Sequence, residues 1–309
     1  MDQVVVNQEL IDLLLSNSIR VRSDLLGSKL TTYNVGGVLK SLLEVNSHTE
    51  ASFVIKTLKD FKIPYRVIGG GSNLILPDDG MASPIIRLGA AFRTVEYSED
   101  RDGSVLVKVG GAVALMTLVR QLSEKGISGL EFAGGIPALI GGAVKMNAGA
   151  HGGEIFSRLK SISVVTQTGD YDELDPHTLN PRYRHSGLPE GALVLGAVLS
   201  LTESDPSRCS EVRAHLLAER KARQPLTFPS AGSVFKNPSP DKAAGWLIEQ
   251  CGLRGFVIGG AKISDMHGNW IVNSDRQAKA SDIISLIDLA KTKVKDQFGL
   301  ELETEQIIW

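Results

Sequence analysis

The stretch Gly69-Gly70-Gly71-Ser72-Asn73 follows directly on the short apolar run Tyr65-Arg66-Val67-Ile68. Three consecutive glycines remove every Cβ at the end of a predicted strand, so a ligand can approach the backbone there. Successive amide N–H groups in such a segment can surround an anion. The same residues also suit a tight turn, so this stretch alone leaves both interpretations open.

A second glycine-rich stretch, residues 134–150, carries five glycines and a single charged residue, Lys145. It is too apolar for a solvated linker and too rich in glycine for a stable helix throughout. We expect its backbone to pack against a large, flat, partly anionic ligand. Neither stretch has the dinucleotide fingerprint, because Leu74 stands where the third glycine belongs, and no Walker A pattern occurs.

The bulk properties favour a globular enzyme. A chain of 309 residues is long enough for two or three domains. Its formal net charge of −2 gives no electrostatic case for a nucleic acid or a membrane surface as partner. Cys209 and Cys251 lack metal-ligand spacing, so we expect free thiols and no metal site. Residues 1–7 lack the features of a secretory leader, which favours a cytoplasmic protein.

Hydrophobic periodicity and capping residues predict an α+β protein. Strands are expected at 42–45, 65–69, 85–88, 105–109, 161–167 and 193–201. Helices are expected at 7–16, 47–61, 112–124, 242–250 and 281–298, and from a linker at 204–207 through residue 223. Ser47 and Glu50 form a capping box, and Ser281 and Gly299 are expected to cap the last helix.

Together, the two glycine-rich stretches resemble those of the UDP-N-acetylenolpyruvoylglucosamine reductases, the flavoenzymes of peptidoglycan precursor synthesis. The matching residues are Gly-Gly-Gly-Ser-Asn-Leu at 69–74 and Gly-Ile-Pro-x-x-x-Gly-Gly-Ala-Val-x-Met-Asn-Ala-Gly-Ala at 135–150. The resemblance extends from Thr31 to Glu305, which is nearly the whole chain.

The resemblance implies an FAD-binding domain of the vanillyl-alcohol-oxidase type (PCMH-type), followed by an α+β substrate-binding domain. We place an N-terminal segment at 1–32, the FAD-binding domain at 33–203 with subdomains at about 33–88 and 89–203, and the substrate-binding domain at 204–309. FAD is expected to be non-covalent, because no histidine occurs between Gly69 and Asn73 to tether it. The residues expected to bind FAD are Gly69, Gly70, Gly71, Ser72, Asn73, Gly134, Ile136, Pro137, Gly141, Gly142, Asn147, Ala148 and Gly149.

Two short motifs match active-site patterns of this family. Gly-Ser-x-Phe-Lys-Asn-Pro at 232–238 implies that Ser233 is the proton donor and that Lys236 and Asn237 face the substrate. Tyr-Arg-x-Ser at 183–186 implies that Arg184 is the active-site arginine, next to the substrate-binding Tyr183. Without the resemblance, Ser233 would suit a turn and Arg184 a surface charge.

A third motif lies near the C-terminus. The family pattern Glu-Pro-Glu-Val aligns its second acid with Glu305, while Thr304 and Gln306 depart from the usual proline and valine. Glu303 is the competing assignment, because residues two apart in a strand share a face. We assign the catalytic acid to Glu305. His267 and Asn269 match a further family pattern, and we expect a structural role for His267.

The implied reaction reduces the enolpyruvyl ether of UDP-N-acetylglucosamine to UDP-N-acetylmuramate, with NADPH as hydride donor and both substrates using one site in turn. Hydride addition to an alkene conjugated to a carboxylate leaves negative charge, which Arg184 can bind bidentately. Ser233 then protonates the adjacent carbon, and Arg184 or Lys236 could ease formation of its alkoxide.

Two other functions are weighed against this one. The chain could be another FAD-dependent oxidoreductase of the same fold that acts on an alcohol or sugar, or a flavin- or nucleotide-binding protein without turnover. The motif around Ser233 would be unexplained by the first, and the presence of both Ser233 and Arg184 argues against the second. These two residues are only 49 positions apart, which resembles the shorter, loop-deleted type of the family. We expect a monomer.

Overall fold

The computed structural model describes residues 8–239 and 241–309, which group into two compact units. The first unit comprises the residues up to Ser23, Ser41–Gly69 and Ala82–Ala218. The second comprises Asp24–Lys40, Gly70–Met81 and Glu219–Trp309. Each unit therefore combines segments that are distant in sequence, and one boundary falls inside the first glycine-rich stretch.

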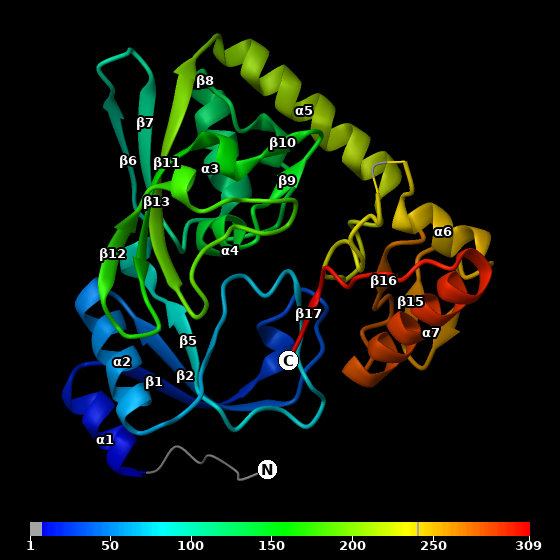
Figure 1. Cartoon of the computed structure of the whole chain (residues 1–309), viewed down its shortest axis with the longest axis horizontal. Helices are drawn as coiled ribbons and strands as arrows, with labels where there is room; N and C mark the ends of the chain where they lie inside the picture. The colour runs from blue at the N-terminus through cyan, green and yellow to red at the C-terminus, as the bar shows by residue number, and fades with distance from the viewer. Residues whose placement is uncertain (1–7, 240) are drawn as a thin grey trace. The chain divides into compact units, whose positions relative to one another are not determined.

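A small sheet and two helices open the chain (Figure 1). The strand order is β1 (Arg20–Leu26), β2 (Val38–Val45), β5 (Ile85–Leu88) and β3 (Arg66–Val67), and β2, β5 and β3 are parallel. Helices α1 (Gln8–Ser16) and α2 (His48–Asp60) bury their apolar sides in one cluster with this sheet. The Oγ of Ser47 accepts a hydrogen bond from the Glu50 amide at 3.0 Å, which confirms the predicted cap of α2.

A larger antiparallel sheet follows in the first unit. Its order is β12 (Tyr171–Leu174), β11 (Leu159–Val165), β13 (Leu193–Glu203), β7 (Val105–Gly110) and β6 (Val95–Glu99), with β8 (Ile127–Ser128) paired to the end of β13. Helices α3 (Leu115–Glu124) and α4 (Ile140–Lys145) lie beside the sheet (Figure 1). Their buried side chains form one apolar cluster with it. The hairpin β9 (Gly149–Ala150) and β10 (Gly153–Glu154) comes directly after α4. The second glycine-rich stretch is thus anchored on this sheet.

The second unit is built around helix α7 (Ala280–Phe298). This helix packs with α6 (Ala244–Gln250) and with the antiparallel sheet β14 (Val257–Ile258), β15 (Ala261–Ile263) and β16 (Ile271–Val272). Strand β4 (Leu74–Ile75) directly follows the first glycine-rich stretch. It pairs in parallel with β17 (Ile307–Ile308), near the end of the chain. Helix α5 (Pro206–Arg223) spans the boundary between the units in sequence.

The predicted α+β class is confirmed, with differences at element ends. Helix α5 begins at Pro206, inside the predicted linker, and α3 begins at Leu115. The predicted cap Ser281 is wrong: the Asp78 carboxylate accepts hydrogen bonds from the amides of Ala280 and Ser281, at 2.7 and 3.0 Å. Gly299 ends α7 with a φ of 67°, as predicted. The predicted start of the first helix at residue 7 lies outside the described residues.

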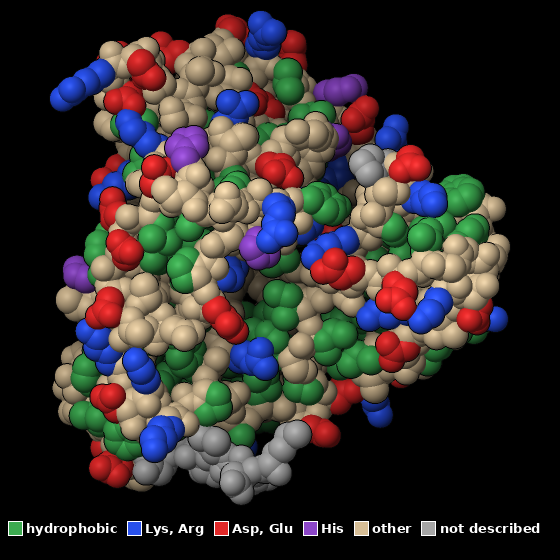
Figure 2. Space-filling model, in the orientation of Figure 1, with side chains coloured by type: hydrophobic (Ala, Val, Ile, Leu, Met, Phe, Trp, Pro, Cys, Tyr) green, Lys and Arg blue, Asp and Glu red, His purple; other side chains and the backbone are tan. Residues whose placement is uncertain are grey.

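Surface features agree with the balanced composition. On the face in Figure 2, acidic and basic side chains are interspersed and form no large patch of one sign.

None of the described helices combines the length and the apolar character needed to span a membrane. The described residues also contain no cluster of His, Cys, Asp and Glu that could hold a metal ion. Cys209 and Cys251 are free thiols, as predicted.

Candidate active site

The first glycine-rich stretch presents bare backbone. Gly71 has a φ of +64°, and a Cβ there would lie 1.8 Å from the Leu30 carbonyl oxygen, so no other residue fits. In the described part of the chain, the backbone N–H groups of residues 69–73 donate no hydrogen bond. These amides can therefore serve an anionic ligand, as the sequence suggested.

One residue of each glycine-rich stretch, Gly69 and Gly142, lies near the other within the first unit. A Cβ on Gly69 would lie 4.0 Å from the Gly142 nitrogen, so the two backbones are near neighbours. A Cβ on Gly142 itself would meet no protein atom within 4 Å, whereas one on Gly141 would lie 3.1 Å from the Val194 carbonyl oxygen. Gly141 thus packs against β13, while Gly142 faces open space that a cofactor can use.

Asn147 links the second stretch to the loop that contains Arg184. Its side chain is fully buried and donates to Glu154 Oε2 at 2.9 Å and to the Arg182 carbonyl at 3.1 Å. Its Oδ1 accepts from the Phe156 amide at 3.3 Å. The Asn147 amide also donates to the Val144 carbonyl at 3.1 Å. The side chain and the amide are therefore occupied by protein, and the predicted contact of Asn147 with FAD is left to its carbonyl group.

The other predicted FAD residues of this stretch differ in exposure. Gly134 is buried, Ile136 is half-buried and Pro137 is exposed. Ala148 is buried, and Gly149 is half-buried in the short hairpin formed by β9 and β10.

Arg184 lies at the tip of a tight turn in the first unit. The turn is closed by two backbone hydrogen bonds of 2.8 Å between Arg182 and His185. Arg184 adopts a φ of 56°, an uncommon conformation for a residue other than glycine, and such strained residues cluster at functional sites. Its guanidinium carbon lies 4.9 Å from the centre of the Tyr183 ring, so the two predicted substrate residues contact each other.

Ser233 and Glu305 lie on two segments that are hydrogen-bonded in the second unit. Phe235 and Thr304 form an antiparallel bridge, flanked by a 2.8 Å hydrogen bond from the Glu305 amide to the Val234 carbonyl. The side chains of Ser233 and Glu305 are both half-buried. The structure therefore pairs the segments that carry the predicted proton donor and the predicted acid, which are far apart in sequence.

The first glycine-rich stretch joins this pair through Asn73. The Asn73 Nδ2 donates to the Glu305 carbonyl at 3.0 Å, and the Ile307 amide donates to the Asn73 carbonyl at 3.0 Å. Asn73, predicted to bind FAD, thus also orients the backbone of Glu305.

The register supports Glu305 over Glu303 as the catalytic acid. Glu303 Oε1 lies 2.5 Å from Lys236 Nζ, and the Glu303 side chain is 72% exposed. Glu305 is half-buried, and its backbone is fixed on both sides. Within the described residues, the Thr304 amide donates no backbone hydrogen bond, so a proline would fit there as in the family pattern.

Asn237 and Asn269 have structural contacts in the second unit. The Oδ1 of Asn237 accepts from the Ala244 amide at 3.1 Å, at the start of α6. Asn269 is buried, and its side chain forms two hydrogen bonds with the backbone of Phe235. Its Oδ1 accepts from the Phe235 amide at 2.9 Å, and its Nδ2 donates to the Phe235 carbonyl at 2.8 Å. Asn269 therefore holds the segment between Ser233 and Lys236, a role that sequence analysis missed.

His267 supports Asn269. Its Nδ1 accepts a hydrogen bond from the Asn269 amide at 3.1 Å. Burial lowers the pKa of His267, and Arg254 lowers it further, while Glu249 opposes the shift. A neutral His267 is consistent with the structural role expected for it.

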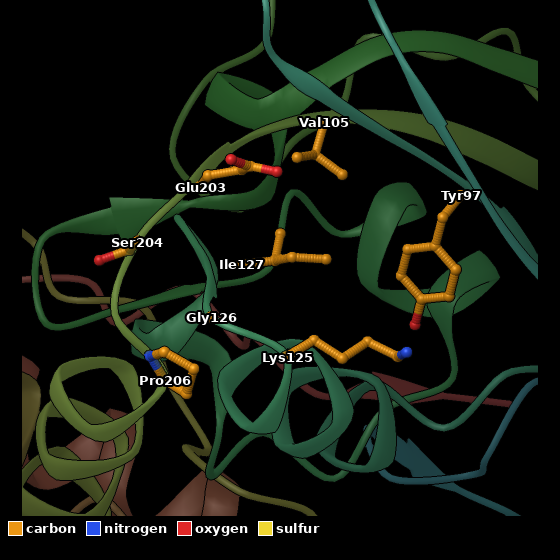
Figure 3. Close-up of a pocket in the computed structure, with 8 residues that line it drawn as sticks. All are labelled: Tyr97, Val105, Lys125, Gly126, Ile127, Glu203, Ser204 and Pro206. Carbon is orange, nitrogen blue, oxygen red and sulfur yellow. The ribbon is translucent and has the colours of Figure 1, made fainter.

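A pocket of about 570 Å³ lies apart from these residues in the first unit (Figure 3). Its lining includes Glu203, Tyr97 and Lys125, whose Nζ lies 5.1 Å from the centre of the Tyr97 ring. None of the predicted site residues lines it, so this pocket is not the place where the glycine-rich stretches meet.

Comparison with known proteins fits this geometry. A model of the FAD binding domain matches residues 40–175, which include both glycine-rich stretches. The bare backbone at Gly69–Asn73 and the open space at Gly142 are what a bound dinucleotide needs. The fold and these features define an FAD-binding flavoprotein.

The chain belongs to the UDP-N-acetylenolpyruvoylglucosamine reductase family. The model of the C-terminal domain of this reductase matches residues 224–309. UDP-N-acetylenolpyruvoylglucosamine reductase 1 of Bacillus anthracis is 40% identical over 296 residues, which are 95% of this chain and 96% of that protein. The reductase of Bacillus subtilis (strain 168) is 38% identical over 277 residues, 89% of each chain.

A solved structure agrees with this assignment. The crystal structure of UDP-N-acetylenolpyruvylglucosamine reductase from Thermus caldophilus is 37% identical in sequence and superposes with a TM-score of 0.79. The match covers 94% of this chain and 99% of the Thermus chain. The predicted family and α+β fold are confirmed, and neither alternative function gains support.

Proposed function

We infer that the protein reduces UDP-N-acetylenolpyruvoylglucosamine to UDP-N-acetylmuramate in peptidoglycan precursor synthesis. The main support for the proposed roles of these residues is a pair of hydrogen bonds, from Asn73 Nδ2 to the Glu305 carbonyl and from the Glu305 amide to the Val234 carbonyl. They join the first glycine-rich stretch, the predicted acid and the segment of Ser233 in one unit. When bound, FAD would provide hydride chemistry for reduction of the alkene, with NADPH as the reductant.

The backbone of both glycine-rich stretches would hold the cofactor. The amides of Gly69–Asn73 can surround the anionic diphosphate, and Gly142 allows close approach because its Cβ position is open. Non-covalent binding follows from the chemistry of these stretches, since residues 69–73 contain no histidine or cysteine.

Ser233 is the proton donor in this proposal. Reduction of the enolpyruvyl group requires a proton at the carbon that bears the ether oxygen and the carboxylate. A serine hydroxyl is a weak acid, but it matches a strongly basic carbanion. Its half-buried position limits competition from water.

Arg184 binds the substrate carboxylate, on which negative charge builds during the reaction. A guanidinium offers two parallel N–H donors to a carboxylate, and such charge-assisted bonds strengthen as the charge grows. The strained turn and the Tyr183 ring restrict the orientation of Arg184 before substrate binds. Tyr183 itself is 47% exposed and is available to contact the sugar nucleotide.

Glu305 orients the proton-donating group, and Lys236 and Asn237 contact the substrate. The Lys236 ammonium lies 2.5 Å from Glu303 Oε1, and this ion pair restricts its position. Asn237 uses its Oδ1 on α6 and retains its amide nitrogen for a ligand.

Stopped-flow absorbance tests the role of Ser233. In Ser233→Ala, NADPH should reduce the bound FAD at nearly the parental rate, whereas reoxidation by the enolpyruvyl substrate should slow by about 10²-fold or more. Ser230→Ala is the matched control, because it makes the same change in the same loop outside the motif. Equal loss in both half-reactions of Ser233→Ala would contradict proton donation.

Two finer statements complete the proposal. We place the protein in the cytoplasm, where free thiols such as Cys209 and Cys251 persist and nucleotide-linked sugars are made. We also propose that it acts as a monomer. Light scattering coupled to gel filtration tests the oligomeric state.

A further inference from the structure

The peptide group that precedes Ser233 needs an external support. Gly232 has a φ of +75°, and a Cβ there would meet nothing within 4 Å, so glycine is needed for its conformation rather than for space. A glycine with open surroundings does not restrain its own peptide. The orientation of the Gly232–Ser233 peptide must be fixed by a hydrogen bond from elsewhere.

Gln306 supplies that hydrogen bond. Its Nε2 donates to the Gly232 carbonyl at 3.1 Å, and its Oε1 accepts from the Tyr33 hydroxyl at 3.1 Å. Both side chains are buried, with Gln306 3% and Tyr33 0% exposed. Only this orientation of the amide satisfies both partners, because the reverse would set two carbonyl oxygens against each other.

The neighbouring residue holds the other side of Ser233. The Glu305 amide donates to the Val234 carbonyl at 2.8 Å. The dipeptide Glu305-Gln306 therefore binds the carbonyl groups of Gly232 and Val234, the residues on either side of Ser233. The backbone that carries the serine hydroxyl is fixed on both sides by the segment that carries the proposed acid.

We propose that Gln306, supported by Tyr33, is a positioning residue that holds the Gly232–Ser233 peptide and thereby orients the Ser233 hydroxyl for proton transfer. The proposal rests on the role of Ser233 given above. The family pattern has valine at this position, and valine has no donor for the Gly232 carbonyl. The Tyr33–Gln306 pair is thus a polar support that valine could not provide.

Stopped-flow kinetics of three variants test the proposal. Gln306→Met keeps the length of the side chain but removes both hydrogen bonds. It should slow reoxidation of the reduced enzyme at saturating enolpyruvyl substrate by about 10- to 100-fold, since a misplacement near 1 Å can cost that much. Reduction by NADPH should change by less than about threefold. Tyr33→Phe keeps the bond to Gly232 and should have a smaller effect than Gln306→Met.

The double variant Tyr33→Phe/Gln306→Met separates positioning from stability. Gln306→Met leaves the Tyr33 hydroxyl buried without a partner, and the double variant removes that hydroxyl. The double variant should melt at a higher temperature than Gln306→Met and should still reoxidise slowly. Recovery of both properties would overturn the proposal, because stability alone would then explain the defect. The double variant also carries the test if Gln306→Met does not fold.

A crystal structure of the double variant without substrate gives a readout independent of activity. We expect a rotated or doubly occupied Gly232–Ser233 peptide, and an unchanged peptide would overturn the proposal. Ser233→Ala distinguishes the two levels of inference. If Ser233→Ala reoxidises at the parental rate, the role of Ser233 fails. If Ser233→Ala is slow and Gln306→Met is not, only the positioning role fails.

Discussion

Replacing Glu305 and Glu303 separately by glutamine tests which of the two is the active-site acid. Glu305→Gln should lower turnover with the enolpyruvyl substrate by roughly 10²-fold or more, because a positioned acid is lost from the proton-transfer site. FAD should remain bound, since the Asn73 contact uses the backbone carbonyl of Glu305, which the substitution keeps.

Glu303→Gln should have a small effect whose size follows from the structure. Glu303 pairs with Lys236, and the two side chains are 72% and 24% exposed. Solvent-exposed ion pairs contribute about 0–1 kcal/mol. A loss of about 1 kcal/mol corresponds to roughly a fivefold change. Turnover of Glu303→Gln should therefore stay within about fivefold of the parent, and the change should appear mainly in the KM.

Steady-state kinetics of both variants with the enolpyruvyl substrate give the two turnover rates and show which acid is needed for catalysis. Visible absorbance of the purified variants shows whether each retains FAD, and thermal unfolding shows whether each is folded. The reverse ranking, with Glu303→Gln severely impaired and Glu305→Gln near the parent, would refute the assignment. It would also mean that Thr304 does not replace the proline of the family pattern one-for-one.

Three further predictions concern the cofactor and the pH dependence of stability. Acid precipitation should release all the yellow colour to the supernatant, and colour retained in the pellet would contradict non-covalent FAD. Gly142→Ala should raise the FAD dissociation constant by roughly tenfold, because the methyl group occupies the open space at this backbone. The apoprotein should melt at the parental temperature or above, since alanine favours helix α4, and unchanged FAD titration would refute the predicted contact. Because burial lowers the folded-state pKa of His267, the unfolded chain binds the proton more readily. The resulting stability is present above about pH 6.5 and is lost as the pH falls below it. Urea unfolding of His267→Asn should show a flatter pH profile there, and an identical slope would exclude His267 as its source.

Helices with local signals were predictable from the sequence. The helical spacing of Ile283, Ile287, Ala290, Val294 and Phe298 predicts an apolar stripe that faces the core, and the first four are buried while Phe298 is half-buried against the same cluster. The cap at Ser47 also follows from residues only three positions apart. Such features depend on neighbours in sequence, so pattern analysis can detect them.

Contacts between distant segments were not predictable in the same way. Asp78 caps a helix that begins two hundred residues later, and Ser281, the local candidate, donates to it instead. Strands β4 and β17 are too short to show a period, and their pairing depends on tertiary contacts. The resemblance predicts that Ser233 and Glu305 act together, but the bridge between Phe235 and Thr304, which pairs their segments, is seen only in the structure.

Three residues around Ser233 have backbone-holding roles that the sequence did not predict. Asn73, Asn269 and Gln306 each use a neutral amide to hold backbone groups of this region. An amide can donate and accept at once, so one side chain satisfies two partners. A charged lysine or aspartate could make single contacts, but it would shift the acidity of a nearby serine or glutamate. It would also attract or repel an anionic substrate. Neutral amides fix the backbone and leave the electrostatics of this region to Lys236 and Glu305. In a sequence these amides look like ordinary loop residues, because their partners are backbone groups that no pattern displays.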